Sequence, residues 1–114
     1  MSQTIAAIAT PPLPSAIGIL RLSGDGALEA AAAVFRPAGG KSLAEYESRR
    51  LVYGTLLGPD GAPIDQALAT ISRAPRSYTG EDTAEFQCHG SPAVLQLGLE
   101  ALFAQGVRQA GPGE

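Results

Sequence analysis

Residues 83–106 read TAEFQCHGSPAVLQLGLEALFAQG, a strand pattern followed at once by a helix pattern. The alternation of apolar and polar residues over 83–88 predicts a strand that buries Ala84, Phe86 and Cys88 on one face. The glycine after this run ends the strand, and the serine and proline that follow are typical of the first positions of a helix. This stretch therefore predicts a half-buried strand that leads directly into a helix.

The predicted helix has Ser91 as its N-cap and Pro92 in its first turn, where the missing N–H of proline does no harm. Its apolar residues recur at helical spacing, and Gly106 ends it. The predicted buried stripe consists of Leu95, Leu99, Leu102 and Phe103.

Toward the N-terminus, two strands are predicted. Residues 4–9 form a short Ile- and Ala-rich run that prolines end. Residues 16–22 are interpreted as a strand buried on both faces until Arg21, and the period of two places Ile17 and Ile19 on the same side as Arg21.

The remaining segments complete a mixed architecture. Asp25 as an N-cap predicts a helix that runs to about Phe35 and is ended by the Arg-Pro pair that follows. After a polar connector, residues 51–57 and 64–72 predict a hairpin around the turn Gly58-Pro59-Asp60-Gly61. A loop precedes the strand described first, and residues 107–110 are interpreted as a last strand. The order indicates an α+β fold, a mixed sheet with helices packed mainly on one side.

Composition narrows the class of protein. The 114 residues suffice for one domain, and the 45% hydrophobic and 17% charged content is that of a folded chain. A net charge of −3 argues against a domain whose main task is to neutralise phosphates. One cysteine excludes an internal disulfide. No apolar run approaches the roughly 20 residues that span a bilayer, and a signal peptide is lacking, so a cytoplasmic location is expected.

Few aromatic residues and many alanines predict a thin core, which association with a second copy or with further domains would relieve. The stretch Gly39-Gly40-Lys41-Ser42 looks like half of a phosphate-binding loop. The full motif needs a glycine five residues before Gly40, where Phe35 stands, and the stretch is expected to follow a helix end instead of a strand. We therefore expect no nucleotide binding there.

Four further residues could take part in catalysis, but each also has a purely structural interpretation. Cys88 and His89 are adjacent, but neighbours on a strand point to opposite faces, so packing is favoured over a Cys-His nucleophile. Glu81 and Asp82 are typical of a surface turn, although paired acids can perform acid–base chemistry. With one histidine and one cysteine, no metal-ligand spacing is present.

Arg21 and Glu85 are harder to explain by packing. Glu85 lies in the middle of a strand, where acids are disfavoured, and Arg21 interrupts an aliphatic face. A carboxylate of this kind could accept two parallel N–H donors, and a guanidinium must find an anion, a carbonyl or water. A solvent-facing acid and a structural ion pair remain equally good interpretations.

Four segments taken together, residues 4–12, 17–24, 77–92 and 112–114, resemble the N-terminal domain of the MnmE (TrmE) family of tRNA modification GTPases. The run from Thr79-Gly80-Glu81-Asp82 to His89-Gly90 is the most specific part. One departure stands at 13–16, where Leu-Pro-Ser-Ala replaces the family's glycine-rich stretch and reduces the amide donors available to a ligand.

The resemblance implies that residues 1–114 are a single folate-binding and dimerisation domain, similar in fold to the folate-binding module of aminomethyltransferases. It implies 5-formyl-tetrahydrofolate as the cofactor, with Arg21 and Glu85 at the positions of family contacts. It further implies a longer parent whose absent GTPase domain uses GTP, K⁺ and Mg²⁺. With the partner MnmG (GidA), that parent would modify carbon 5 of the wobble uridine in tRNA.

Three hypotheses follow from the sequence. The first is the folate-binding homodimer domain of such a GTPase, not catalytic by itself. The second is a scaffolding or dimerisation module that no longer binds folate. The third is a small enzyme that uses Glu81, Asp82 or His89.

Overall fold

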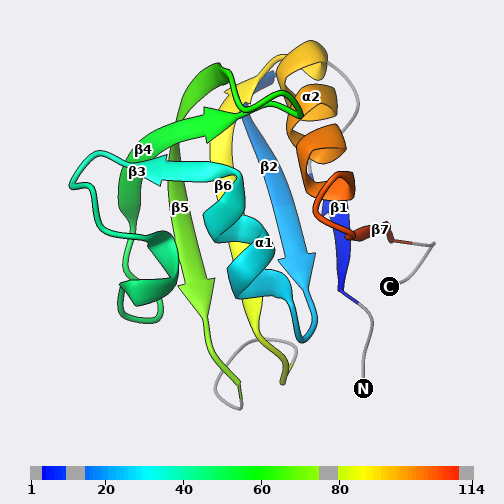
Figure 1. The fold of residues 1–114 in the computed structure, drawn as a ribbon. Helices are drawn as coiled ribbons and strands as arrows, with labels where there is room; N and C mark the ends of the chain where they lie inside the picture. Colours follow the sequence, from blue (N-terminus) through cyan, green and yellow to red (C-terminus); the bar gives the residue numbers. More distant parts are fainter. Residues whose placement is uncertain (1–3, 10–14, 75–79, 111–114) are drawn as a thin grey trace.

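The computed structural model describes residues 4–9, 15–74 and 80–110 and contains one seven-stranded sheet (Figure 1). The strand order is β3-β4-β5-β6-β2-β1-β7. All neighbouring strands are antiparallel except β1 and β7, which are parallel, so the sheet is mixed as predicted. The strands are β1 Ile5–Ile8, β2 Ser15–Ser23, β3 Phe35–Pro37, β4 Val52–Leu57, β5 Pro63–Ser72, β6 Thr83–Gly90 and β7 Arg108–Gln109.

Two α-helices, α1 (Ala27–Ala33) and α2 (Pro92–Phe103), cover one face of this sheet (Figure 1). A short 3₁₀ helix, η1 (Leu43–Glu45), lies in the connector between β3 and β4. The core lies between the helices and the sheet. Its largest fully buried side chains are Phe86, Leu20, Leu22, Leu43, Leu56, Ile71 and Leu102. The α+β class and the one-sided helix packing are therefore confirmed.

The helix α2 begins as the sequence predicted. The Ser91 hydroxyl accepts a hydrogen bond from the Val94 N–H at 3.5 Å, and Pro92 is the first helical residue. In mid-helix, Gly98 lets α2 approach the sheet closely, because a Cβ there would lie 2.6 Å from Leu20 Cδ1. The glycine thus sets the distance between the helix and β2.

The prediction for α1 was wrong at both ends. The helix starts after Gly26, without a side-chain cap, and Asp25 is not its N-cap. It ends at Ala33, and Phe35 begins the edge strand β3, which pairs with β4. The Phe35 ring packs on Phe86, with ring centroids 5.5 Å apart. This burial and the ladder bonds outweigh a weak local helix preference, and a proline is tolerated in an edge strand.

The strand β2 also differs from its prediction. It is buried on one face only, where Gly18, Leu20 and Leu22 lie against the helices. On the other face Ile17 is 56% exposed and Arg21 is exposed. No helix among the described residues covers this side of the sheet, which we call the open face (Figure 1). The strand β6 runs from Thr83 to Gly90, so the glycine is its last residue and the strand ends there, as predicted.

Candidate functional site

Arg21 and Glu85 form a cross-strand pair on the open face. They are directly opposite each other in the register of β2 and β6. Arg21 donates to Oε1 of Glu85 from Nε at 3.0 Å and from Nη2 at 2.8 Å. The Arg21 side chain is 58% exposed and that of Glu85 26% exposed. The structure therefore brings the two predicted site residues together, in the ion pair that the structural interpretation allowed.

Both hydrogen bonds from Arg21 end on the same carboxylate oxygen. Glu85 Oε2 is the oxygen that Arg21 does not use. A carboxylate held this way keeps its orientation while one oxygen can still accept donors from a ligand. A guanidinium more than half exposed also has donors left for carbonyl or carboxylate oxygens.

On the open face, the residues next to the Arg21–Glu85 pair include both apolar and polar side chains. In the next row of the sheet, Ile19 pairs with Gln87, Gln87 with Leu68, and Leu68 with Tyr53. The Tyr53 side chain is 55% exposed, and no described helix covers this row. The charged pair thus borders a partly apolar surface on which planar groups or a protein partner could pack.

A cavity of about 510 Å³ lies beside the pair, over β1 and β2. Its charged lining residues are Arg21 and Glu81, and the rest of its lining is small or aliphatic apart from Ser23. Glu81 Oε1 accepts from the Ser23 hydroxyl at 3.5 Å. A volume of this size falls in the range of pockets that bind small molecules, which is about 300–1,000 Å³.

Asp82, in contrast to Glu81, forms hydrogen bonds to the backbone of two other segments of the chain. Its Oδ1 accepts from the Ala74 N–H at 2.8 Å, and its carbonyl accepts from the Gly24 N–H at 3.0 Å. The two acids proposed as a pair therefore act separately. The structure gives Asp82 a structural role and leaves Glu81 at the cavity.

Cys88 and His89 lie on opposite faces of β6, as predicted, because Cys88 is buried and His89 is exposed. Cys88 is buried, and its thiol donates to the Gly18 carbonyl at 3.6 Å. Burial, with a smaller contribution from the charge of Asp65, raises the pKa of Cys88 to about 11. Such a thiol is a poor nucleophile at neutral pH, so the Cys-His nucleophile is absent.

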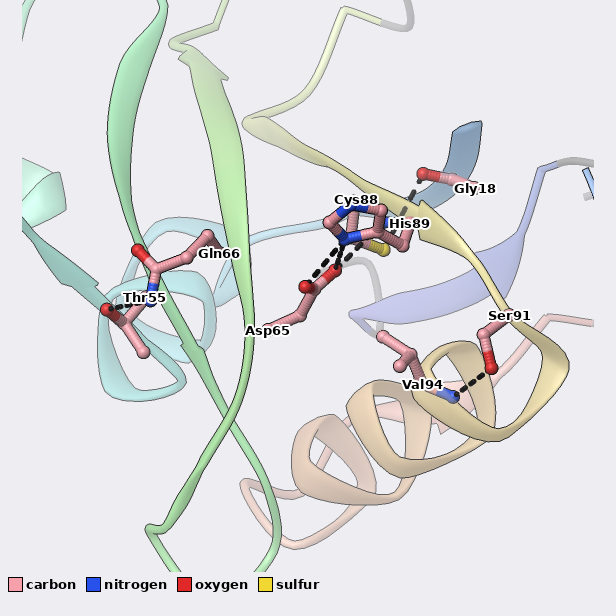
Figure 2. Close-up of polar contacts among 8 residues, drawn as sticks. All are labelled: Gly18, Thr55, Asp65, Gln66, Cys88, His89, Ser91 and Val94. Carbon is pink, nitrogen blue, oxygen red and sulfur yellow. Dashed lines mark hydrogen bonds and ion pairs between the residues drawn. The ribbon is translucent and has the colours of Figure 1, made fainter. Parts of the chain in front are cut away.

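His89 has a partner that sequence reasoning missed. Its Nδ1 lies 2.7 Å from Asp65 Oδ1, and its backbone N–H donates to Oδ2 of the same carboxylate at 2.8 Å (Figure 2). Asp65 thereby satisfies the N–H of His89 beyond the last paired residues of β5 and β6. The two residues are 24 positions apart, and no local pattern links them.

The stretch Gly39–Ser42 has a structural role in the connector between β3 and β4. Ser42 caps η1, and Lys41 Nζ lies 4.4 Å from the centroid of the Tyr46 ring. Contrary to expectation, the stretch follows a strand, β3, and not a helix end. The three-residue helix after it is nonetheless unlike the long helix that follows a phosphate-binding loop.

Some residues quoted for the resemblance lie outside the described ranges, namely 10–12, 77–79 and 112–114, and the altered stretch at 13–14 does too. In the ranges that are described, no group of three His, Cys, Asp or Glu side chains could hold a metal ion. Within the same ranges, every helix is too short or too polar to cross a membrane.

Comparison with known proteins shows the relationship of the chain. Residues 4–114 match the family model described as the GTP-binding protein TrmE N-terminus. A protein of Thermus thermophilus is 53% identical over 115 residues, which covers 100% of this chain and 26% of the relative. One of Chloroflexus aurantiacus is 51% identical over 114 residues, covering 100% and 25%. Both are named tRNA modification GTPase MnmE, and the chain spans about a quarter of their length.

Proposed function

This chain belongs to the TrmE N-terminal family, and from that premise we propose that it is the folate-binding and dimerisation domain of a tRNA modification GTPase. The observation that supports this most is the convergence of Arg21 and Glu85, the two family contact positions, beside a cavity of small-molecule size. The cofactor is 5-formyl-tetrahydrofolate, held as a one-carbon source. The fold of the domain is similar to that of the folate-binding module of aminomethyltransferases.

The parent protein acts in the cytoplasm on tRNA. Its GTPase domain binds GTP with Mg²⁺ and K⁺. Together with MnmG it modifies carbon 5 of the wobble uridine. This chain contributes the cofactor site and the contact between two copies, and by itself it turns over no substrate.

The donor set of the site fits a reduced pterin. A pterin ring presents a ring N–H and an exocyclic amine side by side, which suits a carboxylate such as Glu85. Arg21 holds that carboxylate through one oxygen and can donate to carbonyl or carboxylate oxygens of the cofactor. Bound folate would supply the one-carbon unit, and these two side chains would hold and orient it.

Calorimetric titration of 5-formyl-tetrahydrofolate tests the assignment. Glu85→Ala should weaken binding by roughly 2–3 kcal/mol, about a 30-fold to 150-fold loss, because two ligand donors lose their acceptor. Glu85→Gln should lose nearly as much, since it removes the charge and one acceptor. Arg21→Ala should also weaken binding. Circular dichroism checks that each variant is folded.

The same titration decides between this function and a module that no longer binds folate. The ion pair favours that second candidate, because Arg21 and one oxygen of Glu85 bind each other without a ligand. Folded variants that bind as tightly as the wild type would return both residues to a structural role. No binding by the wild type, up to millimolar folate, would favour the scaffolding module.

A further inference from the structure

The floor of the cavity consists of two cross-strand pairs on the open face of β1 and β2. Ala7 lies opposite Arg21, and Ile5 lies opposite Ser23. All four residues line the cavity. Since side chains at positions two apart on a strand are separated by about 7 Å, the floor presents a charged row and a hydroxyl row side by side.

The space over this floor depends on the direction of the Arg21 side chain and on the small size of Ala7. Arg21 directs Nε and Nη2 to Glu85 on β6, the neighbour of β2 on the side away from β1. Its register partner on β1 is an alanine, which is too small to fill the room beside the arginine. The ion pair therefore keeps the cavity open over Ala7.

The charged groups at this cavity have opposite signs. Arg21 lies at one row of the floor, and Glu81 lies at the next, within 3.5 Å of the Ser23 hydroxyl. Ala9 and Ala110 add small walls. A flat ligand over Ala7 would thus meet a guanidinium, a hydroxyl and a second carboxylate, whereas Glu85 lies outside the lining.

We propose that Glu81 is a further ligand contact, which accepts hydrogen bonds from N–H donors of a reduced pterin lying over β1 and β2, and that Ala7 determines which ligands can enter. This rests on the proposed function and adds the direction in which the ligand extends from Arg21 and Glu85. In the opposite direction, along β6, the ligand would meet His89, whose Nδ1 already contacts Asp65.

Titration of 5-formyl-tetrahydrofolate into Glu81→Gln and Ala7→Leu tests the proposal. Glu81→Gln keeps the size of the side chain and loses its charge, so affinity should fall about tenfold. Ala7→Leu fills the cavity at a half-exposed strand position that accepts larger apolar residues, so binding should fall at least tenfold while the fold persists. Glu100→Gln on α2 and Ala62→Leu in the hairpin turn are the matched controls and should bind like the wild type.

Amide chemical-shift changes during the titration locate the ligand independently of affinity. The proposal expects the largest changes in Ile5–Ile8 and at Ala110. One result that overturns the proposal is a wild type that binds folate and a Glu85→Ala variant that binds it weakly, while Glu81→Gln and Ala7→Leu both bind like the wild type. A second is a set of chemical-shift changes that follow β6 to His89. Those results leave the proposed function standing. A wild type that does not bind folate overturns both.

Discussion

At the scale of single residues, Cys88 is the clearest case of a side chain whose chemistry is suppressed by its position. Its pKa is raised from 9.0 to about 11 by burial and by Asp65. At pH 8 the thiolate fraction should therefore be about a hundredfold lower than in the unfolded chain, and modification by a thiol reagent should slow in proportion. Reaction rates measured with and without denaturing urea check this, and equal rates would contradict it.

The same shift makes stability depend on pH. Below pH 9 the thiol is protonated in both the folded and the unfolded state. Between about pH 9 and 11 the unfolded chain loses the proton first, so the contribution to stability is lost as pH rises through this window. Cys88→Ala should lack this component when urea unfolding is compared at pH 8 and 10.

The Arg21–Glu85 pair should matter little for stability. The arginine side chain is 58% exposed, and exposed ion pairs contribute about 0–1 kcal/mol. Arg21→Ala, Glu85→Ala and the double variant should each lower the free energy of unfolding by no more than about 1 kcal/mol, measured by urea denaturation. A loss above about 2 kcal/mol in either single variant would mean that the pair supports the fold.

At the scale of elements, the edge strand β3 depends on one glycine of β4. Gly54 pairs with Pro37, and a Cβ at Gly54 would overlap the Arg36 carbonyl and come within 2.8 Å of Pro37 Cα. Backbone atoms cannot rotate away, so Gly54→Ala should separate the strands and destabilise the protein by about 2–4 kcal/mol.

Gly39→Ala is the matched control for this prediction. A Cβ there would meet only the Tyr46 hydroxyl, at 3.1 Å, and the end of that side chain can move. Thermal or urea unfolding of both variants provides the comparison. Similar stabilities for the two variants would show that β3 is not held by this close approach.

At the scale of the whole molecule, we expect a homodimer in solution. Eight of the 23 buried hydrophobic residues are alanines, so the core of the described residues is thin. The open face leaves Ile17 and Tyr53 more than half exposed. Sedimentation should show a dimer at micromolar concentration, and Ile17→Lys on the open face should weaken it. Leu97→Lys, at an exposed site on α2, should not. A wild type that is monomeric up to about millimolar concentration would refute the dimer.

The sequence by itself was sufficient for the elements whose signals are local. The alternation in β6, the Ser-Pro start of α2 and the turn between β4 and β5 each depend on neighbouring residues, through side-chain periodicity, capping and turn geometry. The motifs also identified the family. Arg21 and Glu85 stood out because a charge in the middle of a strand pattern lacks a packing explanation.

Only the tertiary structure decided what these residues face. Alternation tells which side chains share a face, but not which strand lies alongside, so the pairing of Arg21 with Glu85, 64 positions away, could not be read from the pattern. The same holds for Asp65 beside His89. Phe35 became a strand residue because burial against Phe86 outweighed its local preference. The open face and its cavity exist because both helices pack on the other side, a choice made by contacts between distant segments.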